Sequence, residues 1–577
     1  MIEKENIKKI YRNGILNGSI KEIKILGSSM LPTISSGTVL KITNDFVIKI
    51  NDIVVTDKKD RSIFVVHRIK EIDDKEEKVC ICGDNEDISK SEWVEKSQII
   101  AKVVDIPTYH LPIKDFNIIV DLPFSAPSAF NSKTYEIYQS ITTKSKNTSY
   151  FDFNLDYNLK MYGEKNIRNF YSSNKLQESD YKVFSQKLTL YRNVAVSKYK
   201  VYKSSYSHMT LCNPYDEKSI YETINNYKQS PFYDFYVSQL NDVKQSILND
   251  IDILNNVAIF VSVDDFNKLI SAIIFSQVLY EMFNILPVLI DNSQLFNSKY
   301  NTTYINKYFK EIIPSYLLNK DIDALNTEYN NLNFSKYVSK EKIAKIRIMR
   351  ECYYKQCLFC DRHGNDNFCF PINNILQKIK NLNKLGVNNI VFEDDCLVPI
   401  QVEKLINLLN ENKTQIQWKG TFRFEEYLNN EKLIKFFADN GCKMLFFGME
   451  SFSQSHLDRM KKGIKVDTAI NILKLCKKYN ILTSISLLFG FPDETTKDLL
   501  ITYEHLRNNI NIIDNIELNY FMPTKNCKII ENDNEINYFK EQNKISDEKM
   551  EVIKKINSFV ITNYKNSFYI KDYLCWQ

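Results

Sequence analysis

The feature that most constrains the fold is a regular alternation of strand-like and helix-like segments, which begins near residue 343 and ends near 521. The expected strands are 343–349, 388–392, 416–422, 443–448, 483–489 and 515–521, and the expected helices lie near 372–385, 400–411, 431–439, 466–479 and 496–509. Short apolar runs that alternate with segments of helical period predict parallel strands covered by helices. We therefore expect a partial (β/α)6 barrel over residues 342–525, with its chemistry at the carboxyl ends of the strands.

The rest of the chain divides into three further parts. A length of 577 residues favours several separately cored domains. Residues 1–107 contain short β-type runs between Gly, Asn and Asp turn signals, which predict a small all-β domain. Residues 108–341 include a strand at 257–263, a helix at 265–283 and a strand at 286–291, a βαβ unit that predicts a parallel α/β domain. Residues 526–577 form a C-terminal extension without an assignable pattern.

Charge and hydropathy exclude several classes of partner. The net charge of +5 is small against 76 basic and 71 acidic residues, and no long Lys/Arg block appears, so nucleic acid is not expected as a partner. No run of about 18 apolar residues predicts a membrane span, and the N-terminus lacks the apolar region of a secretory signal. We expect a soluble, cytoplasmic protein whose 12 cysteines are reduced thiols, some of them metal ligands.

Three of these cysteines lie on one loop after the first barrel strand. Cys352, Cys357 and Cys360 follow a CxxxxCxxC spacing. Three thiolates can hold three irons of a [4Fe–4S] cluster and leave the fourth iron open to chelate S-adenosylmethionine (SAM). The alternatives are a chance grouping and a structural zinc site, for which His363 or Cys369 could supply the fourth ligand.

The barrel resembles the radical SAM superfamily, in particular the branch whose members carry an N-terminal cobalamin-binding domain and often modify ribosomally made peptides. The resemblance covers roughly residues 340–525 and rests on the cysteine loop and on four strand-end motifs, at 392–395 (FEDD), 418–423 (WKGTFR), 447–451 (FGMES) and 489–495 (FGFPDET). It implies a peptide substrate with a leader and an electron donor such as flavodoxin or ferredoxin.

The same resemblance implies roles for individual residues. Phe359 would lie beside the adenine, and Glu393 and Asp394 would receive the amino group of SAM. The carboxylate and ribose would be contacted by Arg423, Glu450 and Ser451. Gly490 would let the backbone approach the adenine, because glycine has no Cβ.

Residues 117–130 and 257–291 resemble the cobalamin-binding domain of this branch. Where the family presents a Gly-Gly turn, this chain has Asp291, Asn292 and Ser293, and an Asp-x-His-x-x-Gly motif is missing. The resemblance leaves cobalamin binding open, but these departures favour a degenerate domain that serves as a scaffold or docks the substrate.

The N-terminal segments 27–34 (GSSMLPTI), 65–69 (VVHRI) and 83–87 (GDNED) resemble the catalytic domain of type I signal peptidases. The resemblance makes Ser29 a nucleophile that needs a nearby base, which His67 would supply. The backbone N–H of Ser29, together with the Ser28 hydroxyl, would stabilise the oxyanion, and Asp84 or Asp87 would orient the imidazole. Because a membrane anchor is missing, a soluble peptide such as a leader is the expected substrate. The alternative is an inactive domain that only binds the peptide.

Together these features predict a peptide-maturation enzyme with two activities. A radical SAM domain would abstract hydrogen from a peptide, and a Ser/His peptidase-like domain would bind or cleave its leader. One alternative is a radical enzyme that acts on a small metabolite or lipid and has a purely structural N-terminal domain. Another is a peptide-binding or protease module with a non-functional barrel.

Overall fold

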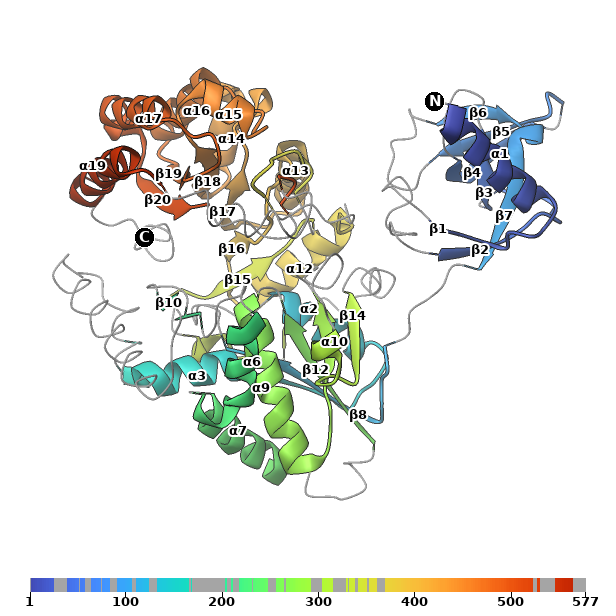
Figure 1. Cartoon of the computed structure of the whole chain (residues 1–577), viewed down its shortest axis with the longest axis horizontal. Helices are drawn as coiled ribbons and strands as arrows, with labels where there is room; N and C mark the ends of the chain where they lie inside the picture. Colours follow the sequence, from blue (N-terminus) through green and yellow to red (C-terminus); the bar gives the residue numbers. More distant parts are fainter. Residues whose placement is uncertain are drawn as a thin grey trace. The chain divides into compact units, whose positions relative to one another are not determined.

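A computed structural model shows the arrangement of the chain (Figure 1). It describes residues 2–24, 39–50, 52–57, 64–73, 75–82, 91–105, 111–123, 132–165, 168, 203–204, 209–210, 217–230, 232–246, 256–263, 266–291, 303–314, 328–330, 332–337, 341–349, 352–360, 369–521, 527–529 and 545–563. Contacts divide the chain into two compact units. The first comprises Met1–Leu111, Ser315–Asp323 and Gly364–Cys369, and the second comprises the remaining residues.

The first unit contains an antiparallel sheet of seven strands in the order β1-β2-β7-β3-β4-β5-β6. The strands are β1 (Glu22–Lys24), β2 (Val39–Thr43), β3 (Ile53–Thr56), β4 (Val65–Asp73), β5 (Lys78–Cys82), β6 (Glu92–Glu95) and β7 (Ile99–Asp105). The predicted sheet is confirmed, but the expectation of an all-β domain is wrong, because helix α1 (Ile2–Leu16) precedes it. Ile15 is buried in the core, and Lys8 and Arg12 form ion pairs with Asp57 at 2.6 and 2.7 Å.

The second unit begins with a parallel sheet of five strands in the order β14-β13-β12-β8-β9. These strands are β8 (Phe116–Asp121), β9 (Thr148–Asp152), β12 (Val257–Val263), β13 (Val288–Asp291) and β14 (Glu311–Pro314). The described helices of this part are α2 (Ser132–Thr142), α3 (Phe153–Tyr162), α6 (Glu217–Asn225), α7 (Tyr233–Ser246), α9 (Phe266–Phe283) and α10 (Thr303–Asn306). Two short strands, β10 (Lys203–Ser204) and β11 (Met209–Thr210), pair antiparallel with each other. The predicted parallel α/β domain is confirmed.

The barrel follows as a six-stranded parallel sheet in the order of the chain, β15 to β20. Its strands are β15 (Ile343–Ile346), β16 (Asn389–Phe392), β17 (Gln417–Phe422), β18 (Cys442–Glu450), β19 (Leu482–Phe489) and β20 (Asn515–Tyr520). Its helices are α12 (Ile372–Lys384), α13 (Pro399–Glu411), α14 (Glu431–Asp439), α15 (Gln454–Arg459), α16 (Val466–Lys478) and α17 (Thr496–Asn508). The predicted partial barrel is confirmed (Figure 1).

The two faces of a barrel strand have different surroundings, as β17 shows. On β17, Trp418 and Phe422 pack against Phe437 of α14, with ring centroids 5.3 and 6.1 Å apart. The intervening residues Lys419 and Thr421 line an internal cavity, and Phe422 at the end of the strand also borders it. Successive side chains of a strand point to opposite faces, so β17 packs against α14 with one face and lines the cavity with the other.

The C-terminal extension covers part of the barrel. Helix α19 (Asp547–Asn563) packs against α17. The Ile529 N–H donates to the Leu358 carbonyl at 3.1 Å, and the Cys527 thiol donates to the Phe359 carbonyl at 3.0 Å. These contacts attach the extension to the cysteine loop. Within the described part of the chain, no helix is long and apolar enough to cross a membrane.

Candidate radical SAM site

The three loop cysteines line one cavity of about 570 Å³ together with the carboxyl ends of β16, β17 and β18 and with inner residues of β15, β19 and β20. The charged lining residues are Lys133, Lys345, Glu393, Asp394, Asp395, Lys419, Arg423, Glu450, Lys462 and Glu517. This is the end of a parallel barrel where functional side chains collect. The cavity therefore unites the predicted metal ligands with residues from every strand.

The surroundings of Cys352 favour its thiolate form. A hydrogen bond from the Cys396 thiol lowers the pKa of Cys352 to about 6, although burial acts in the opposite direction. Arg423 Nη1 donates to Cys357 Sγ at 3.7 Å. Because the thiolate is the form that binds metal, both contacts suit a metal-binding loop.

The zinc alternative requires ligands that meet around one metal ion. Among the described side chains, no three of His, Cys, Asp or Glu meet closely enough to hold one metal ion. A tetrahedral zinc requires four ligands around one point, whereas the thiolates of a [4Fe–4S] cluster bind different irons and stay apart. Of the two candidate zinc ligands, Cys369 belongs to the first unit and His363 lies outside the described residues.

Most of the residues expected to bind SAM lie on this cavity. Phe359, Glu393, Asp394, Arg423 and Glu450 line it. Phe359 packs edge-on against Phe491, with ring centroids 6.4 Å apart. Ser451 and Gly490 are not among the lining residues, and they belong to a neighbouring network of polar contacts described below.

Asp394 is bound to the backbone just before the cysteine loop. Its carboxylate accepts the N–H groups of Ile348 and Met349 at 2.6 to 3.1 Å. Burial raises the pKa of Asp394 to about 7 despite these hydrogen bonds. Its neighbour Glu393 pairs with Lys345 at 3.1 Å. Asp394 thus positions the strand end that carries the loop, and Glu393 presents its carboxylate to the cavity.

Glu450 ends β18 in a strained conformation. Its φ of 62° is rare for a residue with a side chain, and such strain persists where the surroundings stabilise it. Its carboxylate accepts Lys462 Nζ at 2.9 Å and Ser486 Oγ at 3.2 Å. A Cβ at Gly448 would lie 2.6 Å from both Glu450 and Lys462. The glycine of the FGMES motif therefore leaves room for this ion pair.

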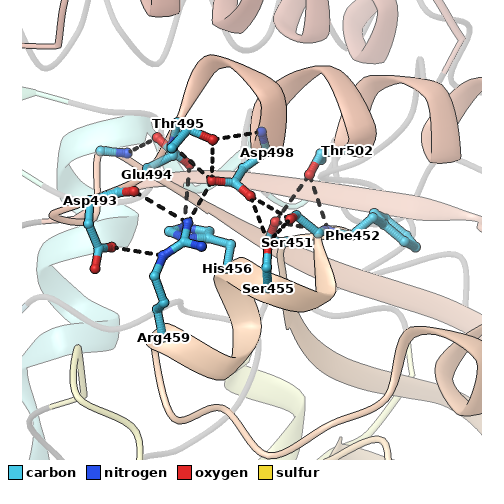
Figure 2. A network of polar contacts seen from close by, with 12 residues as sticks. Ser451, Phe452, Ser455, His456, Arg459, Asp493, Glu494, Thr495, Asp498 and Thr502 are labelled. Carbon is cyan, nitrogen blue, oxygen red and sulfur yellow. Dashed lines mark hydrogen bonds and ion pairs between the residues drawn. The ribbon is translucent and has the colours of Figure 1, made fainter.

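Figure 2 shows the polar network that joins the ends of β18 and β19. Asp498 accepts the hydroxyl groups of Ser453 and Thr495 and the guanidinium group of Arg459, at 2.5 to 2.6 Å. Burial alone would raise the pKa of Asp498, but these hydrogen bonds hold it well below its ordinary value. On the β18 side, Ser451 accepts the Ser453 N–H at 3.1 Å.

The same network fixes the turn after β19. Glu494 accepts the Gly490 N–H at 2.8 Å, and Gly490 has a φ of 76°, which only glycine adopts without strain. His456 is completely buried beside Glu494, with Nε2 3.7 Å from the carboxylate. Burial lowers the pKa of His456 to about 4, so this pair is not ionic at neutral pH.

The predicted peptidase residues are only partly described. His67 is buried in β4, where it lies opposite Val54 of β3. Ser28, Ser29, Asp84 and Asp87 lie outside the described residues. The structure therefore places the expected base on a strand of the first unit and leaves the pairing with Ser29 as a prediction.

The middle sheet has its topological switch point between β8 and β12. In open α/β sheets, ligands bind beyond the strand ends at this point. Here Asp121, the last residue of β8, forms a buried ion pair with Lys268 of α9 at 2.7 Å. Thr134 Oγ1 also donates to Asp121, at 3.0 Å. A buried ion pair therefore stands at the carboxyl end of β8, next to this point.

Several cavity residues had escaped the sequence analysis. Cys396 directly follows the motif at 392–395, and Lys462 lies on the loop between α15 and α16. Lys133 comes from the middle domain. Lys345 and Lys419 could have been found, because they stand at alternate, inward-facing positions of predicted strands. Loop residues have no such period, so the sequence offered no signal for Lys462 or Lys133.

Comparisons with known proteins agree with this site. The Radical SAM superfamily model matches residues 346–506, less than a third of the 577-residue chain. An uncharacterized methyltransferase of Pyrococcus horikoshii is 26% identical over 164 residues, which cover 27% of this chain and 35% of that protein. The ribosomal protein uS12 methylthiotransferase RimO of Clostridium botulinum is 29% identical over 141 residues, 21% of this chain and 30% of that protein.

A solved structure of the radical SAM methyltransferase TsrM from Kitasatospora setae is similar at a TM-score of 0.41 and 8% identity, over 72% of this chain and 77% of that one. The chain spans about a third of the length of the curated relatives it matches. The matched segment begins in β15 and contains all three loop cysteines. The barrel of this chain is therefore a domain of the radical SAM superfamily, whose cofactors are a [4Fe–4S] cluster and SAM.

Proposed function

We propose that this chain is a radical SAM enzyme that abstracts a hydrogen atom from a substrate bound in its barrel. The observation that carries the proposal is one cavity lined by Cys352, Cys357 and Cys360 and by residues from all six parallel strands of the barrel. When bound, the reduced cluster and SAM supply a carbon-centred radical. The electron would come from a donor such as flavodoxin or ferredoxin.

In this proposal the chain holds SAM with side chains that already line the cavity. Phe359 offers an apolar ring for the adenine, and Glu393 accepts hydrogen bonds from the amino group. Lys462 and Glu450 form a buried pair that can reorganise around the carboxylate and the ribose. Ser451 and Gly490 do not line the cavity and contribute indirectly, because their hydrogen bonds fix the turns after β18 and β19.

The cysteine assignment is tested by anaerobic reconstitution of the full chain. Wild-type protein should contain about four irons and release 5′-deoxyadenosine from SAM on reduction. Cys357→Ala should lose both properties, because a cluster ligand is removed. Cys476→Ala is the matched control, since Cys476 is a buried barrel cysteine of α16 that does not line the cavity. Unchanged iron content and SAM cleavage in Cys357→Ala would refute the assignment.

We infer a peptide substrate from the resemblance of the first unit to signal peptidases. In this proposal Ser29 attacks a leader peptide with His67 as its base, while the radical domain modifies the same peptide. Ser29→Ala should abolish cleavage of a fluorogenic peptide library and leave SAM cleavage intact. The control is Ser97→Ala, at an exposed serine between β6 and β7 of the first unit, which should preserve both activities. Equal peptide cleavage by wild type and Ser29→Ala would reduce the first unit to a binding or structural role.

A second candidate function is methyl transfer, which the names of the Pyrococcus and Kitasatospora proteins suggest. In the branch that the sequence resembles, this reaction involves cobalamin in the middle domain. The buried pair of Asp121 and Lys268 argues against that role, because it places two charged protein side chains at the end of β8, beside the switch point. We therefore propose a degenerate middle domain. Stoichiometric binding of hydroxocobalamin to the full chain, followed by its absorption spectrum, would contradict this proposal.

A further inference from the structure

Arg423 follows the last residue of β17 and has all three of its guanidinium nitrogens engaged. Nη2 donates to the Lys462 carbonyl at 2.5 Å, and Nε donates to Glu425 at 3.2 Å. The guanidinium carbon lies 3.4 Å from the centroid of the Tyr354 ring, which belongs to the cysteine loop. A planar group that is stacked and hydrogen-bonded in this way is held in one orientation. Arg423 is therefore preorganised against the loop before any cofactor binds.

The third nitrogen is directed at a cysteine. Nη1 donates to Cys357 Sγ at 3.7 Å, and both side chains are buried. Arginine keeps its positive charge in proteins. The Glu425 carboxylate pairs with Arg423, but it is 28% exposed, so water partly screens its negative charge. A fixed cation and an N–H donor thus lie beside the sulfur of a residue proposed to bind the cluster.

The positive charge and the hydrogen bond would both raise the reduction potential of a bound iron–sulfur cluster. The reduction potential of such a cluster depends on its net charge and on hydrogen bonds to its sulfur atoms. A positive charge beside the cluster stabilises the form that carries one more electron. We propose that Arg423 is a positioning residue for the cluster, which orients the Cys357 thiolate and makes the bound cluster easier to reduce. The inference rests on the proposed function.

The test is a redox titration of the full-length, reconstituted protein without SAM, followed by electron paramagnetic resonance with dithionite as the reductant. We compare wild type with Arg423→Met, which removes the charge, and Arg423→Lys, which keeps it. Arg423→Met should lower the equilibrium constant for one-electron reduction about tenfold, a shift of about 59 mV to more negative potential. The reduction potential of Arg423→Lys should lie between those of wild type and Arg423→Met. Arg507→Met, which removes an exposed arginine of α17, should leave the potential unchanged.

The outcomes separate this inference from the proposed function. A wild-type protein that takes up no cluster overturns both. A loaded wild type with the same potential in Arg423→Met overturns only the inference, and weaker SAM binding in that variant would then assign Arg423 to the SAM carboxylate. If Arg423→Met takes up no cluster, Arg423→Lys decides. Uptake by the lysine variant supports a need for positive charge, and failure of both variants overturns the inference in favour of a packing role.

Discussion

His456 and Glu494 are two titratable side chains buried side by side in the network of Figure 2. Burial lowers the pKa of His456 to about 4 and raises the pKa of Glu494 to about 7. Both groups are therefore neutral in the folded barrel at mildly acidic pH, although each would be charged in an unfolded chain. The network that fixes the Gly490 turn thus contributes a pH dependence to the stability of the barrel.

For His456 the sign follows from proton linkage. Between pH 6.5 and 4 the unfolded chain binds a proton that the folded barrel does not, so the free energy of unfolding falls as the pH falls. At 1.36 kcal/mol per pKa unit, the loss amounts to about 3 kcal/mol. We predict that His456→Asn loses less stability than wild type across this window, as measured by thermal unfolding of apoprotein at each pH.

His505→Asn is the matched control, because His505 is a half-buried barrel histidine outside the network. Glu494 acts in the opposite direction, since its raised pKa removes stability as the pH rises from about 4.5 to 7. The difference between wild type and His456→Asn therefore isolates the histidine. Identical pH profiles for these two proteins would contradict the assignment.

Individual side chains also mark the limit of what the sequence predicts about the site. The motifs identified Asp394 and Arg423 as residues near the cofactors, and both line the cavity. Their hydrogen bonds to the Met349 backbone and to Cys357 were not predicted. These partners lie 45 and 66 residues away along the chain, and no local pattern encodes which nearby group a buried side chain will bind.

Whole elements were more predictable than single contacts. The six barrel strands lie within a few residues of their predicted positions, because a buried parallel strand is a short apolar run bounded by turns. Helix α1 was missed, since its segment was considered only as a possible export signal. The short helix α15 was also missed, and its six residues are too few to show a helical period.

The loop after α15 lies close to the cysteine loop at Gly463. Gly463 has a φ of 65°, and a Cβ there would lie 1.9 Å from the Tyr354 hydroxyl. We predict that Gly463→Ala displaces Tyr354 and with it the cysteine loop, so that reconstituted protein contains less iron than wild type. The left-handed backbone adds a stability cost of about 1 kcal/mol. Iron content and thermal unfolding measure the two effects.

Gly386→Ala is the control that separates the backbone strain of an alanine at positive φ from the displacement of Tyr354. Gly386 has a similar φ of 72°, but the nearest atom to its Cβ would be Lys342 Nζ at 3.8 Å, which is an ordinary contact. This variant should show the backbone cost and keep its iron. Equal iron contents in the two alanine variants would mean that the close approach of Gly463 to Tyr354 does not position the loop.

At the scale of the whole molecule, the middle domain and the barrel belong to one compact unit. Arg347, which follows β15, forms a buried ion pair with Glu136 of α2 at 2.8 Å. On the same helix, Lys133 lines the cavity of the barrel. The Tyr337 hydroxyl, near the start of the barrel, donates to Asp152 of β9 at 2.7 Å. Buried charges and hydrogen bonds therefore join the two domains beside the cysteine loop.

We predict that Glu136→Gln destabilises this unit. The change leaves the buried Arg347 guanidinium without its carboxylate, and loss of one partner of a buried pair costs about 3–5 kcal/mol. Glu164→Gln is the control, because it removes an exposed pair with Arg168 that contributes at most about 1 kcal/mol. Thermal unfolding of both variants measures the difference, and equal melting temperatures would contradict the prediction.

The position of Lys133 has a consequence for how a substrate can be selected. Since α2 supplies part of the cavity wall, the reaction chamber is enclosed by two domains and not by the barrel alone. Changes in the middle domain can then alter which molecules are admitted without touching a single cluster ligand. The middle domain can therefore act as a specificity element through α2, whether or not it binds a cofactor of its own.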